Sequence, residues 1–161
     1  MDANSYKEIW DFKASDPCAA MTAVDGSFSE EGLQHTGRWS ANQVKNALGV
    51  DRQDRLLELG CGVGRIGREL APHCGRWLGV DISDNMIDNA ERRLAHLDNV
   101  QFHRLSRTSL DMVGDGEIDK AYSIAVFCHM DKEDLYLYLR ELRRVLREGG
   151  LIFVETWNLA S

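Results

Sequence analysis

Two kinds of hydrophobic pattern alternate along the chain from residue 40 onward. Short apolar runs bounded by turn residues predict strands over residues 55–59, 76–80, 100–104, 118–127 and 151–155. Between them apolar residues recur every three or four positions, which predicts helices from Ser40, after the glycine cluster, from Ser83 and from Lys132. This alternation with short turns predicts an α/β fold, a parallel sheet covered by helices on both faces.

The predicted helices carry recognisable ends and apolar faces. Ser40 and Gln43 match a capping box, and Gly49 stands where a C-terminal glycine belongs. Ser83 is the expected N-cap of a later helix, while residues 14–37, rich in small and polar residues, predict a loop. The expected buried faces are Met86, Ile87, Ala90, Leu94 and Leu97 in one helix, and Leu135, Leu139, Leu142 and Leu146 in the helix over residues 132–147.

Residues 1–39 are expected to form an N-terminal leader or lid in front of a domain over residues 40–161. Because the leader precedes the first strand, it can fold over an end of the sheet, where Tyr6, Trp10 and Trp39 would line a lid. Packing of these aromatic side chains against the sheet edge is an equally good interpretation.

Composition limits the classes of partner. The 161 residues include 19 basic and 26 acidic ones, a net charge of −7, which argues against a nucleic-acid or anionic-membrane surface, since both need clustered positive charge. No apolar run reaches the roughly 18 residues of a membrane span, and the first residues lack the order of a signal peptide. We therefore expect a cytoplasmic protein. The four cysteines form no Cys-x-x-Cys pair, which indicates reduced thiols and no structural metal.

The segment Glu58-Leu59-Gly60-Cys61-Gly62-Val63-Gly64-Arg65-Ile66-Gly67 follows the first predicted strand. Residues 62–67 match the dinucleotide pattern G-x-G-x-x-G, whereas residues 60–64 match a shorter G-x-G-x-G turn behind an acidic residue. Glu58 would repel a pyrophosphate by about 1 kcal/mol or more at short range, and it would attract a ligand with an ammonium and a sulfonium. We favour the cation-binding interpretation, and Asp81, at the end of the second strand, suits the ribose of either ligand.

Four motifs in order carry a family resemblance. Residues 58–65, Val80-Asp81-Ile82-Ser83, Ile118-Asp119 and residues 144–150 together resemble a class I S-adenosylmethionine-dependent methyltransferase, over roughly residues 36–157. The resemblance implies a Rossmann-like doubly wound sheet of strand order 3-2-1-4-5. It also implies S-adenosylmethionine as cofactor, lying across the carboxyl ends of strands 1, 2 and 4.

The resemblance also implies the residues around the methionine part of the cofactor. Gly60, Gly62 and Gly64 would shape that pocket, with Glu58 nearby. The backbone around Ile124, in the fourth strand, would contact the same part.

At the nucleoside end, the resemblance implies that Asp81 holds the ribose and that Ile82 and Met86 pack against adenine. Arg38 is placed like the basic residue that meets the cofactor carboxylate in some relatives. Family members usually carry an Asp after the third strand, where this sequence has Ser106, so the adenine contact departs from the family pattern.

Methyl transfer is an in-line displacement in which the protein mainly positions the nucleophile. His129 follows the fourth strand and is the candidate general base for an oxygen or nitrogen acceptor. Tyr6, Trp10 and Trp157 are candidate substrate contacts, and we expect a small-molecule acceptor, not nucleic acid or membrane. Two alternatives remain: a non-catalytic cofactor- or partner-binding module of the same fold, and a nicotinamide-dependent oxidoreductase.

The family normally continues past the fifth strand with a helix and an antiparallel pair, so strands 6 and 7 are apparently missing. Either the chain is truncated, or its apolar fifth strand (residues 151–154) is covered by another subunit or by the leader. A bare edge predicts self-association into a homo-oligomer.

Overall fold

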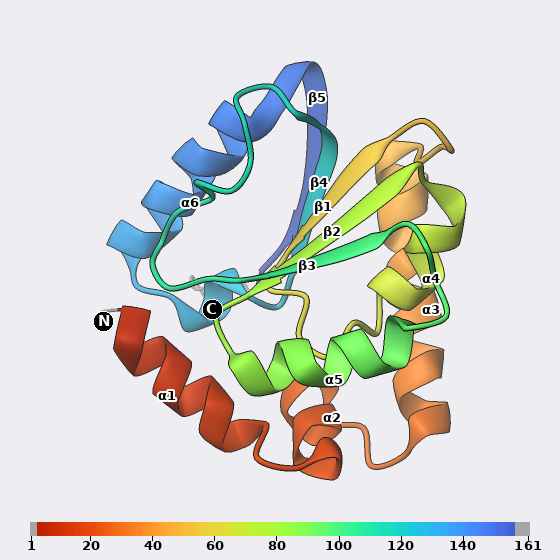
Figure 1. The fold of residues 1–161 in the computed structure, drawn as a ribbon, viewed down its shortest axis with the longest axis vertical. Coiled ribbons are helices and arrows are strands. Elements are labelled where there is room, and N and C mark those ends of the chain that lie inside the picture. Colours follow the sequence, from red (N-terminus) through yellow and green to blue (C-terminus); the bar gives the residue numbers. More distant parts are fainter. Residues whose placement is uncertain (1–2, 157–161) are drawn as a thin grey trace.

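A computed structural model describes residues 3–156, and Trp157, an expected substrate contact, lies outside the described residues. Its five parallel strands form one sheet in the order β3-β2-β1-β4-β5 (Figure 1). Their bounds are β1 Arg55–Leu59, β2 Arg76–Asp81, β3 Val100–Arg104, β4 Ile118–Ile124 and β5 Leu146–Glu155. The predicted strand order is confirmed.

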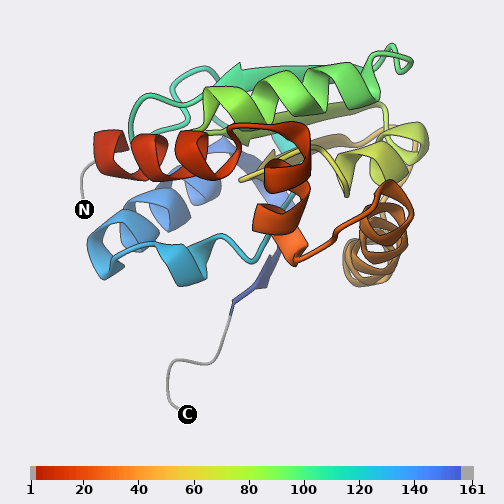
Figure 2. The same cartoon turned by 90° about the horizontal axis from the view of Figure 1, so that it is seen from below.

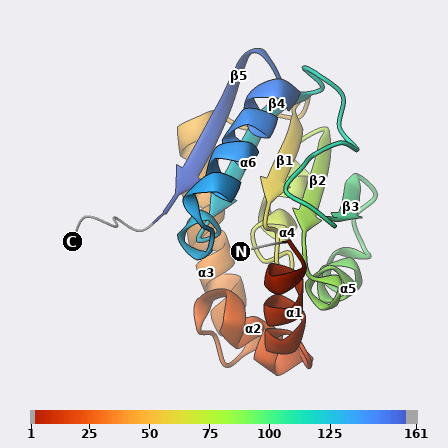
Figure 3. The same cartoon turned by 90° about the vertical axis from the view of Figure 1, so that its left-hand side faces the viewer.

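Helices cover both faces of the sheet. One face packs against α3 (Glu30–Leu48), α4 (Gly67–Leu70) and α5 (Asp84–Leu94), around the buried side chains of Leu56, Trp77 and Tyr122. The other face packs against α6 (Lys132–Val145) and against the irregular segment between β3 and β4 (Figure 3). The short helices η1 (Ala71–His73) and η2 (Phe127–His129) follow α4 and β4. None of the helices within the described residues is long and apolar enough to cross a membrane.

The N-terminal region is helical, and the expectation of a loop over residues 14–37 is wrong. It contains α1 (Ala3–Lys13), α2 (Pro17–Asp25) and the first turns of α3. Asp16 caps α2 by accepting from the N–H groups of Cys18 and Ala19. Figures 2 and 3 show α1 and α2 lying at the carboxyl ends of the strands.

Helix α3 begins eleven residues earlier than its pattern predicts, because Ser29 and not Ser40 is the N-cap. Ser29 Oγ accepts from Gly32 N at 3.1 Å. Ser40 is buried in the middle of the helix, so the boundary expected between residues 39 and 40 falls inside α3. The predicted C-terminal glycine is confirmed, with Gly49 in the left-handed region at φ 61°.

Two further expectations need correction. In α6 the buried side chains are Tyr138, Leu142 and Val145, whereas Leu139 is 41% exposed. Buried positions recur every three or four residues from Tyr138, so Leu139 lies outside the buried face of the helix. Strand β4 ends at Ile124, three residues before the predicted end, because the next residue leaves the extended region.

Strand β5 lies at the edge of the described sheet and pairs with β4 alone there. Leu151 and Ile152 are 47% and 39% exposed. The self-association expected from such an edge stays a prediction.

Candidate functional site

A cavity of about 110 Å³ opens at the carboxyl ends of β1, β2 and β4, under α1 and α2. Its walls come from seven separate stretches of the chain, so it exists only in the folded protein. The lining residues are Tyr6, Trp10, Ala23, Val24, Glu58, Leu59, Gly60, Cys61, Gly62, Arg65, Ile66, Asp81, Ile82, Met86, Leu105, Thr108, Ile124, Ala125, Val126, His129, Met130 and Tyr138.

The glycine turn after β1 forms the floor of this cavity. Gly60 N and Cys61 N both donate to Val80 O, at 2.8 and 3.0 Å, which ties the turn to β2. Gly60 and Gly62 have φ values of 75° and 51°, a region that side chains disfavour. A Cβ atom on Gly60 would lie 2.3 Å from Val126 Cγ2, so the turn presses directly against the segment after β4.

Asp81, at the end of β2, faces the cavity with both carboxylate oxygens held. Oδ2 accepts from Gly62 N at 2.8 Å, and Oδ1 accepts from Ser83 N at 2.9 Å. Burial raises the pKa of Asp81, while donation from these backbone groups opposes the rise. Each oxygen retains a second lone pair, so the carboxylate can accept further hydrogen bonds from a ligand.

Glu58, at the other side of the glycine turn, is buried in the sheet, with 3% exposure. Its Oε2 accepts from the Tyr122 hydroxyl at 2.6 Å, and that hydroxyl accepts from Trp77 Nε1 at 2.9 Å. Burial raises the pKa of Glu58 to about 8, against the opposing effect of the Tyr122 hydrogen bond and of the charge on Arg65.

The arginine in the cavity wall is Arg65, not the expected Arg38. Arg65 donates from Nη1 to Ser40 Oγ at 3.0 Å, and its Nε lies 3.9 Å from Asp25 Oδ2. Arg38 is exposed on α3 and does not line the cavity. Ser106 is likewise exposed and outside the lining.

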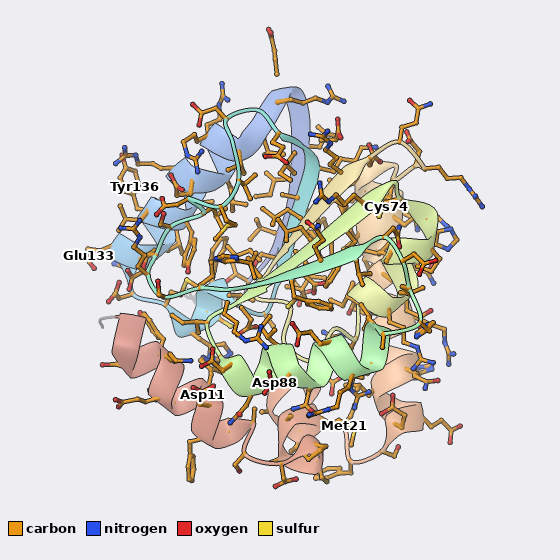
Figure 4. All side chains as sticks on the ribbon, viewed as in Figure 1. Asp11, Met21, Cys74, Asp88, Glu133 and Tyr136 are labelled. Atoms are coloured by element: carbon orange, nitrogen blue, oxygen red, sulfur yellow. The ribbon has the colours of Figure 1, made fainter. Side chains whose placement is uncertain are left out.

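Helix α1, from the expected leader, contributes to the cavity wall. Tyr6 and Trp10 line the cavity, and the Tyr6 hydroxyl accepts from Asp131 N at 3.0 Å. Asp11, labelled in Figure 4, accepts from Ser83 Oγ at 2.7 Å and so fastens α1 to the start of α5. Trp39, the third aromatic residue expected in the lid, is 57% exposed on α3 and outside the lining.

His129 lies in the cavity wall at the end of η2, where the sequence places it. Its ring meets Trp10 edge to face, with 5.1 Å between the centroids. Partial burial lowers the pKa of His129, and the positive charge of Lys13 lowers it further. The imidazole is therefore neutral at pH 7, the form that can accept a proton.

Several residues of the cavity wall could not be predicted from the sequence. Thr108 and Tyr138 come from segments with no motif, and only the packing of α6 and of the segment after β3 brings them to the cavity. Ala125 has φ 57°, the single positive value outside glycine among the described residues. Such backbone strain is common at functional sites.

No group of three or more His, Cys, Asp or Glu residues in the described part of the chain is arranged to hold a metal ion.

A parallel sheet of this order, with a glycine turn after β1 and a carboxylate at the end of β2 facing one cavity, defines a Rossmann-like nucleotide-cofactor-binding domain. Residues 56–150 match the family described as "Methyltransferase domain". The chain belongs to this family of S-adenosylmethionine-dependent methyltransferases.

Curated relatives share this region. The chain is 36% identical over 124 residues to 24-methylenesterol C-methyltransferase 2 of Oryza sativa subsp. japonica, covering 74% of this chain and 33% of the relative. It is 34% identical over 106 residues to N-demethylindolmycin N-methyltransferase of Streptomyces griseus, covering 65% and 44%. It is 32% identical over 99 residues to phosphoethanolamine N-methyltransferase 1 of Arabidopsis thaliana, covering 61% and 20%. The chain thus spans less than half the length of these relatives.

Solved structures share the fold. Phosphoethanolamine N-methyltransferase 1 of Haemonchus contortus, in complex with phosphoethanolamine and S-adenosylhomocysteine, superposes with a TM-score of 0.77 at 18% identity, covering 94% of this chain and 31% of that one. The [4+2]-cyclase SpnF superposes with a TM-score of 0.75 at 20% identity, covering 96% and 60%.

Proposed function

We propose that this chain binds S-adenosylmethionine in the cavity and transfers its methyl group to an oxygen or nitrogen atom of a small molecule. Family membership and the three relatives named above, each a methyltransferase, support methyl transfer. A nitrogen acceptor has the support of two of these relatives, which are named as N-methyltransferases. The observation that carries the proposal is the pair of buried carboxyl groups, Glu58 and Asp81, on either side of the glycine turn in one cavity. A pyrophosphate cofactor would meet two carboxyl groups there, whereas a cationic one is attracted by them.

The residues present suit the cofactor from end to end. Asp81 has lone pairs left for the two ribose hydroxyls. Ile82, Met86 and Leu105 offer an apolar wall for the adenine ring, and this wall lacks the usual carboxylate. When bound, S-adenosylmethionine supplies a methyl group already activated by its sulfonium.

The methionine end of the cofactor would lie over the glycine turn. Gly60 and Gly62 line that space without side chains, and Ile124 closes it from β4. Gly64 lies outside the lining, and a Cβ there would meet Leu94 and Ala90 of α5. Glu58 faces the cationic groups, and Arg65 replaces Arg38 as the arginine within reach of the carboxylate.

The acceptor would enter beside α1. Tyr6 and Trp10 exclude water from this end, and His129 is held against Trp10 in its neutral form. We assign His129 the acceptance of the proton that an oxygen or nitrogen acceptor loses on methylation. The apolar and aromatic character of Tyr6, Trp10 and Met130 suits a small organic molecule.

Two measurements test the proposal. Isothermal titration should give binding of S-adenosylhomocysteine and none of NADH; binding of NADH alone would favour the oxidoreductase alternative. Transfer of labelled methyl groups to a panel of small amines, phenols and carboxylates then tests catalysis, with His129→Ala beside His103→Ala, an exposed histidine outside this cavity. Binding without transfer to any acceptor would favour the non-catalytic alternative, since a fold does not by itself confer a reaction.

A further inference from the structure

A row of three buried side chains runs behind the cavity through the middle of the sheet. Glu58 on β1 pairs in register with Gly79 on β2 and with Tyr122 on β4. Trp77, two residues before Gly79, shares its face of the sheet. Of these, Glu58 lines the cavity, whereas Trp77 and Tyr122 are fully buried behind it, with 0% exposure.

Two glycines fix the position of the Trp77 indole. A Cβ atom on Gly67 or on Gly79 would lie 2.2 Å from a ring atom of Trp77, closer than any side chain allows. The space that these glycines leave lets the ring reach across β1 toward β4. Phe102 closes the other side with an edge-to-face contact, 5.4 Å between centroids.

The hydrogen bonds along the row have a forced direction. Indole Nε1–H can only donate, so the Tyr122 hydroxyl accepts from Trp77 at 2.9 Å. The single hydroxyl hydrogen then points to Glu58 Oε2, at 2.6 Å. The carboxyl group therefore receives a hydrogen bond from Tyr122 inside the sheet, and the backbone N–H of Gly67 also donates to it.

We propose that Tyr122, oriented by Trp77, is a positioning residue that fixes Glu58 for the cationic end of the cofactor and lets Glu58 give up a proton when that cation binds. This inference rests on the proposed function. It adds two residues that touch neither cofactor nor acceptor and act through Glu58 alone.

The charges around Glu58 support the proton step. Asp81 and the Cys61 thiol face it from the cavity side, Arg65 from the glycine turn and Tyr122 from β4. With burial as the largest cause, the pKa of Glu58 rises to about 8, so the carboxyl group is mostly protonated at pH 7. An ammonium or sulfonium beside it favours the carboxylate, and the released proton passes to solvent. Donation by Tyr122 also favours the carboxylate, so loss of this donor makes release harder.

The test compares Tyr122→Phe with Ser123→Ala. Both changes delete a buried hydroxyl of β4 that bonds to β1, but Ser123 Oγ donates to Leu59 O and does not touch Glu58. S-adenosylmethionine and S-adenosylhomocysteine are titrated calorimetrically into each protein between about pH 6 and pH 9, in two buffers of different ionisation enthalpy, which counts the protons released.

For the wild type we expect affinity to rise with pH up to about 8, with a fraction of a proton released at pH 7. Tyr122→Phe should weaken binding about tenfold, the usual effect of losing a hydrogen bond to a charged group, and should move the rise in affinity to higher pH. Ser123→Ala should change neither. Glu58→Gln, whose amide oxygen can still accept from Tyr122, should abolish proton release.

The outcomes separate the two proposals. If the wild type binds neither ligand, the proposed function and this inference both fail. If the wild type binds but releases no proton anywhere in the range, or if Tyr122→Phe keeps the wild-type affinity and pH profile, the positioning role fails and the proposed function stands. The proton count on the wild type decides the question even where Tyr122→Phe does not fold.

Discussion

The loss of stability in Gly60→Ala measures how closely the glycine turn packs against the segment after β4. In Gly60→Ala the new Cβ would lie 2.3 Å from Val126 Cγ2 and 2.9 Å from Val126 Cγ1. Gly26 is a matched position, because its φ of 79° is close to the 75° of Gly60 and nothing lies within 4 Å of its Cβ position. Gly26→Ala therefore reports the backbone strain alone.

The expected losses of unfolding free energy can be worked out for Gly26→Ala and Gly60→Ala. A left-handed backbone costs an alanine roughly 1–2 kcal/mol, of which about 0.4–1 kcal/mol is offset because alanine lowers the entropy of the unfolded chain. We expect Gly26→Ala to lose about 1 kcal/mol of unfolding free energy. Gly60→Ala bears the same strain and must also displace Val126, an overpacking cost of roughly 1–3 kcal/mol, so its total should be about 2–4 kcal/mol.

Urea denaturation of Gly60→Ala and Gly26→Ala measures these losses of unfolding free energy. The same measurement is made on Val126→Ala and on the double variant that combines Gly60→Ala with Val126→Ala. The double variant should recover most of the overpacking cost, since only Val126 Cβ, at 3.2 Å, remains close. Because Val126 also lines the cavity, Gly60→Ala should weaken binding of S-adenosylhomocysteine, and Gly26→Ala should not. Equal losses of stability in Gly60→Ala and Gly26→Ala, or no recovery in the double variant, would refute the close approach.

Three further predictions concern charged groups. Asp81→Asn should weaken S-adenosylhomocysteine binding about tenfold or more by calorimetry, because an amide can accept only one of the two backbone hydrogen bonds; Asp88→Asn, half-exposed on α5, is the control and should bind normally. The folded protein keeps a proton on Glu58 between the ordinary pKa of 4.5 and about 8, where the unfolded chain has lost it, so this group makes stability fall as pH rises through that window and level off above it. Urea midpoints of Glu58→Gln should lack that part of the slope, and an unchanged slope would contradict it. Arg144→Ala should cost about 1–3 kcal/mol and speed proteolysis of the segment between β3 and β4, because Arg144 donates to two carbonyl oxygens of that segment at 3.0 and 3.1 Å; the exposed Arg143→Ala should stay within about 0.5 kcal/mol of wild type.

The sheet was predictable because most of its strands are short apolar runs bounded by turn residues. Strand β5 was predicted only in part, because it begins at Leu146, which was expected in the preceding helix. The helices α2 and α3 were not, although their caps stand in the sequence. Asp16 before Pro17, and Ser29 before two glutamates, are helix starts. The residues after Asp16 are mostly small and apolar with no clear polar face, and those after Ser29 are mostly polar, so neither segment shows an apolar stripe. The helices owe their stability to packing at the carboxyl ends of the strands, which no local pattern displays.

The misplaced arginine follows from a close approach of the backbone. Gly37 lets α3 lie against the glycine turn, since a Cβ there would be 2.6 Å from Arg65 O. The next residue points about 100° further round the helix, so Arg38 faces solvent while Arg65 stays in the cavity wall. Sequence spacing places a residue on an element, whereas the contact between two elements decides where its side chain points.

Ser106 differs from its expected place for a similar reason. Leu105 N donates to Asp81 O at 2.8 Å, which continues the pairing of β2 with β3 by one residue and turns Leu105 into the cavity. Ser106 lies in the bend that follows and is exposed, and Thr108 is the next polar group in the wall. The part of the cavity wall formed by Ile82, Met86 and Leu105 is therefore apolar.

One residue links the lid to the carboxylate that would hold the ribose. Ser83 N donates to Asp81 Oδ1, and Ser83 Oγ accepts from Met86 N as the cap of α5. The same hydroxyl donates to Asp11 of α1 at 2.7 Å. Ser83 thus hydrogen-bonds to the start of α5, to Asp81 and to α1. Helix α1 is therefore bound to the element that carries Asp81 and forms part of the cavity wall.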